Sequence, residues 1–439
     1  MTKPRVAIIG GGFSGLTIAY TLQKYGIASV VYEAQDEVGG LASSFTMHGT
    51  TLDKFYHHWF TSDAEVLQLV SELGMSAKLS TQATRTGMYY AHNFYKLSSP
   101  IDLLRYKPLA ILDRIRLGLL YLKASKVQDW GRLESIRAKD WLIAMGGINV
   151  YQKVWEPLLK GKFGSYADEI SAVWIWNKLK LRGGSRGKKG QEQLMYLEGG
   201  FATVAMQIEK QLTLQGSKVL CGQEILSLTP KDTGWQLTTK ESSNFYDVVI
   251  ATCALPEFSN IINKFASESY LASLNAIPYL ANVCLILELN QPLSDLYWIN
   301  VADPSFPFVG IIEHTNFINK GAYNNRHLVY LSRYLEHTNE IYNYDNKALL
   351  SFALPHIRSM FPKFDQSTIL QSYSWKARYA QPIVTKHYSS LIPSTKTPYK
   401  NLYLCSMAQI YPEDRGTNYA IREGRQLAEQ LKAQGVFSF

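Results

Sequence analysis

Cysteine is scarce in this chain. Four cysteines are spread over 439 residues, at Cys221, Cys253, Cys284 and Cys405. They form no CxxC pair and no metal-ligand spacing, so the sequence predicts neither a disulfide framework nor a metal site. Their mostly apolar, strand-like surroundings are typical of reduced core cysteines, and we expect a cytoplasmic protein.

Long apolar runs are missing as well. No run approaches the ~20 residues that span a bilayer, and the sequence has no internal repeat. A cleavable signal peptide is not expected, because its removal would take away the apolar stretch Val6 to Ile9. With 439 residues, 46% of them hydrophobic, the chain suggests two globular domains.

Acidic residues are fewer than basic ones. The chain has 36 Asp and Glu against 45 Lys and Arg, which gives a net charge of +9. A nucleic-acid partner is not predicted, because the cations are scattered and no nucleic-acid motif is present. Two local clusters of basic residues account better for the excess of positive charge.

The first cluster is the glycine-rich stretch 181–190. Its sequence LRGGSRGKKG holds four glycines and four cations, the first of which is Arg182. It could act as a lid or as a clamp on an anionic substrate, or it could be a solvated surface loop. The surface loop is the favoured interpretation, and Arg182 remains a candidate substrate ligand.

The second cluster predicts a basic amphipathic helix that starts near Ser99 and Pro100 and is divided at Pro108. Such a helix could contact anionic lipid, but packing in the core or between domains is the favoured prediction. Its apolar positions are Leu104, Ile111, Leu112, Ile115, Leu119 and Leu122, and cations lie among them at Arg105, Lys107, Arg114, Arg116, Lys123 and Lys126.

A glycine-rich turn follows the first apolar strand. Residues 10–15 read GGGFSG, and the spacing of Gly10, Gly12 and Gly15 is GxGxxG. Gly10 permits the tight turn, Gly12 lets backbone approach a pyrophosphate, and Gly15 lets a helix over 16–25 pack on the strand. The helix N-terminus, with Phe13 and Ser14, then faces the phosphates. This pattern predicts a dinucleotide site.

An acid and a second glycine pair refine that prediction. The next strand, residues 29–33, ends in Glu33, which is placed to accept the ribose hydroxyls, and Ala34 follows it. A nicotinamide dehydrogenase has no need of the later Gly39 and Gly40, whereas a flavoprotein uses them to carry backbone past the pyrophosphate and ribityl chain. The sequence therefore predicts FAD, held in part by Gly39, Gly40, Leu41 and Ala42.

At these residues the chain resembles the FAD-dependent amine oxidase and protoporphyrinogen oxidase superfamily. The arginine usual after the glycine pair is Leu41 here, which weakens any transfer of amine-oxidase chemistry. The resemblance implies that the chain re-enters the flavin domain at 196–201. A helix to about Gly216, strands at 217–220 and 248–252, and Ile225 near the adenine edge follow from it.

The same resemblance covers the C-terminus. Residues 401–405 would form a last strand, and 411–418 would lead into a helix over about 419–433. It implies that Asp414 binds the ribityl hydroxyls and that Gly416, Thr417 and Asn418 direct backbone N–H groups at the flavin pyrimidine edge. An ordinary capped surface turn is the alternative.

The fold class expected is α/β. A Rossmann-like FAD-binding domain of glutathione reductase type is predicted from residues 1–62, 191–255 and 398–439. A substrate-binding domain of helices and antiparallel sheet is predicted from 63–190 and 256–397. Many of the latter's aromatic residues are expected in the core, and some in a pocket.

The candidate catalytic residues are His57 and His58, which follow the third strand, near the flavin in relatives. A histidine there could accept a substrate proton or bond the flavin, or be satisfied in the core. Lys160, Lys162 and Arg415 are candidate substrate ligands, because cations and glycines interrupt an apolar helix end at 155–164 and Arg415 adjoins the flavin motif. A plain helix terminus is the alternative interpretation of 155–164.

The function predicted is transfer of a hydride from a small-molecule substrate to flavin N5. No second glycine-rich turn is present for NADPH, so electrons would pass to oxygen, a quinone or a partner. The alternative is a non-redox flavoenzyme similar to UDP-galactopyranose mutase, acting on a nucleotide sugar. A flavin-bearing scaffold is a third class. The sequence does not predict an oligomeric state.

Overall fold

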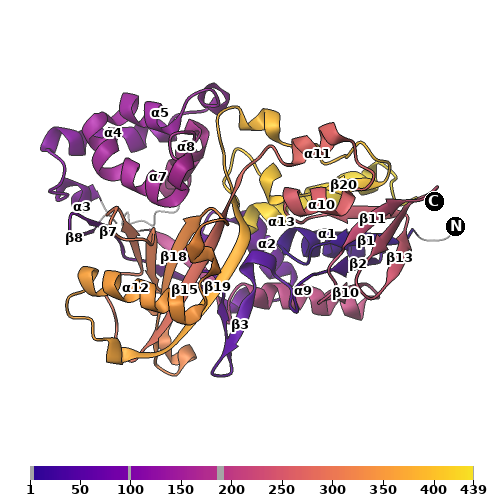
Figure 1. The fold of residues 1–439 in the computed structure, drawn as a ribbon, viewed down its shortest axis with the longest axis horizontal. Helices are drawn as coiled ribbons and strands as arrows, with labels where there is room; N and C mark the ends of the chain where they lie inside the picture. The colour runs from indigo at the N-terminus through magenta and orange to yellow at the C-terminus, as the bar shows by residue number, and fades with distance from the viewer. Residues whose placement is uncertain (1–3, 97–99, 185–191, 439) are drawn as a thin grey trace.

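The first strand lies at the centre of a parallel sheet built from distant parts of the chain. The computed structural model describes residues 4–96, 100–184 and 192–438 (Figure 1). Five parallel strands form this sheet in the order β10-β2-β1-β14-β20. Their bounds are β1 Val6–Ile9, β2 Ser29–Tyr32, β10 Lys218–Leu220, β14 Val248–Ala251 and β20 Leu402–Leu404. The predicted strands are therefore confirmed, with small differences at their ends.

Two layers cover the parallel sheet, because successive side chains of a strand point to opposite faces. Val6 and Ile8 of β1 lie in a core with the helices α1 (Phe13–Lys24), α9 (Ala202–Leu214) and α13 (Thr417–Ala433). Ala7 and Ile9 lie in the opposite core, which includes the antiparallel strands β11 (Ser227–Pro230), β12 (Trp235–Thr238) and β13 (Ser243–Tyr246). All four β1 side chains are thus buried, as in a central parallel strand.

A second, mixed sheet of seven strands lies beside the first (Figure 1). Its order is β19-β15-β18-β17-β16-β7-β8, and only the β16–β7 pairing is parallel. The helix α12 (Asn346–Met360) packs on the face that carries Leu285 and Leu287. The strands of this sheet are β7 Thr86–Tyr90, β8 Asn93–Lys96, β15 Tyr279–Leu289, β16 Trp298–Val301, β17 Gly310–Glu313, β18 His327–Leu335 and β19 Ile369–Pro382.

A group of helices forms the third part of the molecule, at the upper left of Figure 1. They are α3 (Pro100–Leu104), α4 (Ile111–Ser125), α5 (Ala138–Gly146), α6 (Ile148–Val150), α7 (Glu156–Phe163) and α8 (Ala172–Gly184). The break between α3 and α4 confirms the predicted division at Pro108. A π-helical turn, Tyr151–Trp155, precedes α7.

The prediction that the apolar series of this helix pair packs in the core is wrong. The α4 residues in the core are Leu117, Leu120 and Ala124, which lie on the opposite side of the helix. The predicted series is exposed, with fractional exposures from 45% at Leu119 to 70% at Leu112. The helix has two apolar faces, and the sequence period alone could not tell which of them is buried.

The remaining elements connect these parts. They are the hairpin β3 (Ser44–Met47) and β4 (Thr50–Asp53), the sheet β5-β9-β6 (Trp59–Phe60, Gln193–Leu197, Leu79–Ala83), and the helices α2 (Ala64–Glu72), α10 (Leu255–Ile262) and α11 (Glu268–Leu274). The buried Asp53 accepts hydrogen bonds from Tyr196 Oη (2.7 Å) and from the Phe201 N–H (3.0 Å). It thereby joins the end of β4 to the segment that returns the chain to the parallel sheet. None of the described helices is long and apolar enough to cross a bilayer.

Candidate functional site

One large cavity runs from the carboxyl end of the parallel sheet to the group of helices. Its volume is about 1050 Å3, above the range of roughly 300–1,000 Å3 typical of a pocket for one small ligand. One end is lined by the two glycine-rich turns and Glu33, and the other by aromatic rings, histidines and cations. The carboxyl edge of such a sheet is where α/β proteins bind ligands.

The two glycine turns pack against each other at the first end. Gly12 and Gly39 form a parallel β-bridge, and the Gly39 N–H donates to the Gly11 carbonyl at 2.9 Å. Gly10 has a φ of 108°, and a Cβ there would lie 2.6 Å from Thr252 Oγ1. A Cβ on Gly40 would lie 3.2 Å from Gly12 Cα. Glycine is favoured at Gly10 by its positive φ and the nearby Thr252 side chain, and at Gly40 by the approach of backbone to backbone.

Glu33 is held beside these turns. Its Oε2 accepts the Gly11 N–H at 2.7 Å and its Oε1 accepts the Gln35 N–H at 2.8 Å. The side chain is buried, and the carbonyl of Glu33 accepts from Gln223 N–H at 2.8 Å, which brings Ile225 to the same end of the cavity. Each carboxylate oxygen keeps a further lone pair for a ligand hydroxyl.

The N-terminus of α13 points into the middle of the cavity. Gly416 caps the helix in extended backbone without a side-chain cap bond, and Gly416, Thr417 and Asn418 all line the cavity. Thr417 Oγ1 accepts from Trp59 Nε1 at 2.7 Å, and Asn418 Oδ1 accepts the Glu65 and Val66 N–H groups at 3.1 and 3.2 Å. These side-chain oxygens bind other parts of the protein and fix the start of the helix. The groups of the helix start that can bind a ligand are therefore its first backbone N–H groups.

An ionic cluster lies next to this helix start. The buried Asp414 contacts Lys178 Nζ at 2.6 Å and Lys162 Nζ at 3.9 Å. Burial alone would raise the pKa of the Asp414 carboxyl, but the charges of Lys178, Lys162 and Arg415 outweigh it and hold that pKa well below its usual value. The cluster therefore stays ionised and ties α7 and α8 to the segment before α13.

Gln381 joins Asp414 to Arg415. Its Nε2 donates to Asp414 Oδ1 at 3.1 Å, and its Oε1 accepts from Arg415 Nε at 3.1 Å. Arg415 also donates to Tyr334 Oη at 2.7 Å. An adjoining pocket of about 110 Å3 is lined by Leu41, His57, Tyr334 and Arg415, among others. The guanidinium is thus oriented by two partners at the cavity wall.

His57 lies in this pocket as a neutral imidazole. Its Nδ1 is 2.7 Å from the Phe55 carbonyl, which can only accept, so Nδ1 carries the proton and Nε2 is the acceptor nitrogen. Burial lowers the pKa of His57 to about 4, and the nearby Arg415 charge also lowers it, against the opposing effect of the Phe55 hydrogen bond. At neutral pH His57 is therefore unprotonated, and its Nε2 can accept a hydrogen bond.

His58 faces an aromatic wall instead. Its Nδ1 lies 3.1 Å from Tyr297 Oη, and its ring packs edge-on against Phe60 and Trp298. Other aromatic residues of the cavity wall include Tyr56, Trp155, Trp174, Tyr334, Trp375 and Tyr379. Trp141, Trp176, Tyr279, Tyr330 and Tyr373 do not line it. The distal end of the cavity is consequently suited to a flat or apolar ligand.

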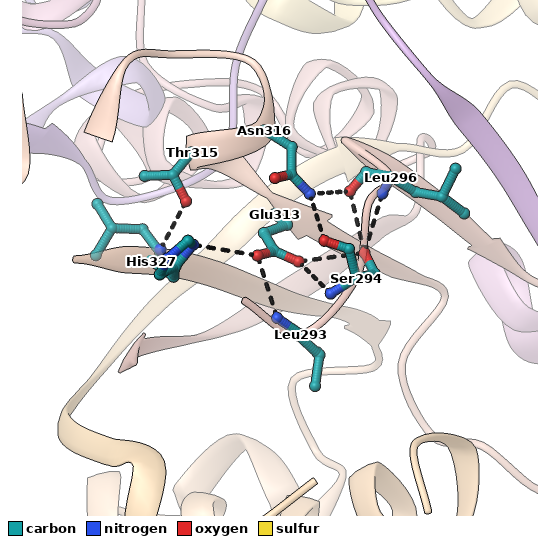
Figure 2. Close-up of polar contacts among 8 residues, drawn as sticks. Leu293, Ser294, Leu296, Glu313, Thr315, Asn316 and His327 are labelled. Atoms are coloured by element: carbon teal, nitrogen blue, oxygen red, sulfur yellow. Dashed lines mark hydrogen bonds and ion pairs between the residues drawn. The ribbon is translucent and has the colours of Figure 1, made fainter. Parts of the chain in front are cut away.

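A buried polar network holds the segment that carries Tyr297 (Figure 2). Glu313 at the end of β17 accepts from Leu293 N–H (3.2 Å), Ser294 N–H (2.7 Å) and Ser294 Oγ (3.2 Å). The Glu313 N–H in turn donates to the Tyr297 carbonyl at 2.9 Å. The network therefore positions Tyr297, and through it His58.

The pH dependence of stability tests this network. Burial raises the pKa of Glu313 to about 7, so between its ordinary value and pH 7 the folded state binds more protons than the unfolded state. The contribution of Glu313 to stability should fall as pH rises through that window, by at most about 3 kcal/mol. We expect the unfolding free energy of wild type minus that of Glu313→Gln to decrease between pH 4.5 and 7 in urea titrations. A difference independent of pH would contradict this assignment.

A family model described as flavin containing amine oxidoreductase matches residues 13–432. The chain belongs to this family. Protoporphyrinogen oxidase 2 of Arabidopsis thaliana is 25% identical over 295 residues, which are 57% of this chain and 57% of the relative. Coproporphyrinogen III oxidase of Bacillus subtilis is 25% identical over 317 residues, 64% of this chain and 66% of the relative. Both matches span less than two thirds of the relative's length.

The fold of this flavin oxidoreductase family is also found in solved structures. Reduced UDP-galactopyranose mutase superposes with a TM-score of 0.78 at 14% identity, covering 99% of this chain and 95% of that one. The chain is accordingly an oxidoreductase of the flavin family with a mixed α/β fold, and FAD is its cofactor. The cavity fits that cofactor, because both glycine turns and the buried Glu33 line it, and each Glu33 carboxylate oxygen keeps a lone pair for a ligand hydroxyl.

Most predicted cofactor residues of this flavoprotein line the one cavity. They are Gly10, Gly12, Phe13, Ser14, Glu33, Ala34, Gly39, Gly40, Leu41, Ala42, Ile225, Asp414, Gly416, Thr417 and Asn418. Gly15 lies behind them, where α1 meets β1. His57, His58, Lys162 and Arg415 also line the cavity. Their individual roles toward FAD or substrate stay predictions.

Two predicted substrate ligands, Lys160 and Arg182, are not found among the described residues of the cavity wall. Lys160 does not line the cavity: it is exposed on α7 and pairs with Glu156 at 2.9 Å. Residues two apart on a helix point in nearly opposite directions, so Lys162 faces the cavity and Lys160 faces solvent. The side chain of Arg182, and residues 185–190 of the predicted basic loop, lie outside the described residues.

Sequence reasoning missed Lys178, Gln381 and Tyr334, which complete the cluster around Asp414 and Arg415. Lys178 lies in α8 with Lys180 and Arg182, and the sequence alone does not show which of these cations has a buried partner. No local pattern marks Gln381 or Tyr334, because their partners are 33 and 81 residues away.

Replacing Glu33 by alanine tests the adenosine end of the FAD site. The substitution removes a charged acceptor worth about 1.5–3 kcal/mol, so FAD affinity should drop by roughly one to two orders of magnitude. Titration of the apoprotein with FAD measures this, and Glu33→Gln, which keeps an acceptor oxygen, should lose less. The fold should survive. Unchanged affinity in Glu33→Ala would show that Glu33 is not a ribose ligand.

Proposed function

We propose that this flavoprotein oxidises a small molecule bound in the aromatic end of the cavity, and that FAD receives the hydride. The supporting observation is His57, a neutral imidazole that lines the same wall as Leu41 and Arg415 next to the flavin-binding turns. FAD, when bound, accepts a hydride at N5. The electrons then leave to oxygen, a quinone or a partner.

The residues of the chain would hold FAD along the cavity. We propose that residues 1–62, 191–255 and 398–439 form a Rossmann-like FAD-binding domain of glutathione reductase type, and that 63–190 and 256–397 form the substrate domain. Glu33 would bind the ribose, and the α13 N-terminus would stabilise negative charge at the pyrimidine edge. Asp414, already engaged by Lys178, would contact the ribityl chain or position the helix start.

The proton released with the hydride would pass to His57. Nε2 is the acceptor nitrogen, and the Nδ1–H bond to the Phe55 carbonyl fixes the ring and partly offsets the destabilisation of the imidazolium by burial and by Arg415. A loss of one hydride to FAD and one proton to Nε2 balances a two-electron oxidation of the substrate. Arg415, held by Gln381 and Tyr334, would orient the substrate.

The substrate class we favour is large and flat or apolar. Six aromatic side chains at the distal end support this choice: Tyr56, Trp155, Trp174, Tyr297, Trp298 and Tyr334. The names of the relatives agree with it, since they include oxidases of protoporphyrinogen and coproporphyrinogen III and a desaturase of zeta-carotene. An anionic or sugar substrate remains the alternative, with the cations Lys162 and Arg415 as its ligands.

Anaerobic mixing separates these possibilities. The FAD-loaded protein is mixed without oxygen with protoporphyrinogen, coproporphyrinogen III or zeta-carotene, and the visible flavin absorbance is followed. We expect at least one of them to bleach the oxidised flavin, and admission of air or a quinone to restore it. A mutase-like enzyme would instead convert a UDP-sugar only after dithionite reduction and leave the flavin reduced, which would overturn the proposal.

A further inference from the structure

We propose that α3 and α4 form a docking face for an anionic membrane surface. Seven large apolar side chains of this helix pair are exposed, at Ile101, Leu104, Ile111, Leu112, Ile115, Leu119 and Leu122. Their fractional exposures run from 45% to 70% within a stretch of 22 residues. Such a concentration marks an interaction surface, whereas single exposed apolar residues are ordinary.

The exposed residues of α4 share one side of the helix. At 3.6 residues per turn, positions 111, 112, 115, 119 and 122 fall within a stripe about a quarter of the circumference wide. Leu117, Leu120 and Ala124 occupy the opposite side and are buried in the core. The stripe is therefore not needed to hold α4 in the fold.

The helix pair is fixed in place, so the stripe cannot simply turn inward. Arg114 donates to the carbonyls of Leu104 and Leu109, which joins the end of α3 to the first turn of α4. Lys153 donates to the Pro108 carbonyl at 2.8 Å. Tyr106 and Leu109, in the connection between the helices, are each only 1% exposed.

The charge of the exposed side chains on α3 and α4 indicates which kind of surface binds this face. The exposed cations of residues 101–126 are Arg105, Lys107, Arg116, Lys123 and Lys126. The acids of the same stretch are less available, because Asp102 is half-buried and Asp113 is buried and bonded by Arg116 and Asn149. An apolar stripe flanked by cations on a helix that does not span a bilayer is the pattern of an interfacial helix on anionic lipid.

The face also lies close to the cavity. Tyr121, on the same helix, lines the cavity wall and packs near Trp155 with ring centroids 6.2 Å apart. The lipid surface would thus lie about one helix diameter, roughly 10 Å, from the cavity wall. The docking face itself does not depend on the chemistry proposed for that cavity.

Vesicle flotation tests the docking face with the full-length holoprotein. Wild type is mixed with phosphatidylcholine vesicles or with vesicles that contain phosphatidylglycerol. We expect it to float with the anionic vesicles and to be released by high salt. The triple variant Ile111→Ser, Leu112→Ser, Leu122→Ser should bind about a hundredfold more weakly, and Lys123→Gln with Lys126→Gln about thirtyfold more weakly.

A matched control changes three apolar residues that are exposed elsewhere: Met206→Ser, Leu214→Ser, Leu370→Ser. It should bind vesicles as wild type does, and all variants should keep their FAD. Wild type that stays free of the anionic vesicles would overturn the proposal. So would sedimentation velocity that shows a dimer dissociated by the α4 triple variant, because the face would then belong to a second copy of the chain.

Discussion

Gly15→Ala is expected to yield a protein without FAD and with a lower melting temperature. A Cβ at position 15 would lie 2.0 Å from the Gly10 carbonyl oxygen and 3.0 Å from Thr252 Oγ1. Relief requires α1 to move away from β1, because the closest atom is backbone. The movement would open the glycine turn, which we propose faces the pyrophosphate, and would weaken the contact of α1 with α13. We expect a destabilisation above about 3 kcal/mol.

Gly118→Ala is the matched control for this substitution. Gly118 is a helical glycine of α4 whose added Cβ would meet only Leu103 Cδ2 at 3.7 Å, an ordinary contact. Alanine there should be neutral or slightly stabilising, since it favours the helix by about 1 kcal/mol over glycine. Thermal unfolding and the visible flavin absorbance per protein measure both variants. A Gly15→Ala protein that retains FAD and wild-type stability would contradict the packing described here.

His57→Ala is expected to slow flavin reduction by roughly 10²–10⁴-fold while FAD stays bound. The imidazole is the proton acceptor of the proposed reaction, whereas the residues proposed to bind the pyrophosphate and ribose are the glycine turns and Glu33. Rapid mixing with the substrate that bleaches the wild-type flavin measures the rate. His58→Ala serves as the comparison, because His58 bonds Tyr297 on the aromatic wall. Equal rates for wild type and His57→Ala would remove His57 from the mechanism.

The pH profile gives an independent test of the same residue. The pKa of His57 is lowered to about 4, so its neutral form is present at all higher pH values. Because the reaction needs the neutral imidazole, the rate should rise with pH through about 4 and not through the ordinary histidine value near 6.5. A rate that falls with decreasing pH around 6.5 would indicate that the His57 imidazole is solvated. If the same fall is seen in His57→Ala, it is caused by another group.

Local patterns carried most of the information about the flavin end. The strand, turn, helix and acid from Val6 to Glu33 are consecutive, and each element has its own signal. The helix starts differ slightly: α1 begins at Phe13 and α13 at Thr417, because Gly12 and Gly416 serve as extended N-caps. Glycine caps leave no side-chain signature, so sequence reasoning placed both starts too late.

Long-range contacts explain what the sequence could not predict. The partners of Asp414 come from α8 and β19, so no window of sequence shows them together. Lys160 and Lys162 are equivalent as residue types, and only the direction of α7 separates the exposed one from the one in the cavity. The apolar series of α4 was wrongly predicted to be buried for the same reason. Which of the two apolar faces is buried depends on the elements that pack against the helix, and these come from distant parts of the sequence.

Release of the cofactor is the measurement that tests the central claim most directly. The purified protein is denatured by heat, and the supernatant is analysed for flavin by chromatography against FAD and FMN standards. The glycine turns, Glu33 and the α13 N-terminus predict a yellow protein that releases FAD, held tightly and without a covalent bond. A colourless protein that takes up no FAD on titration would contradict the account.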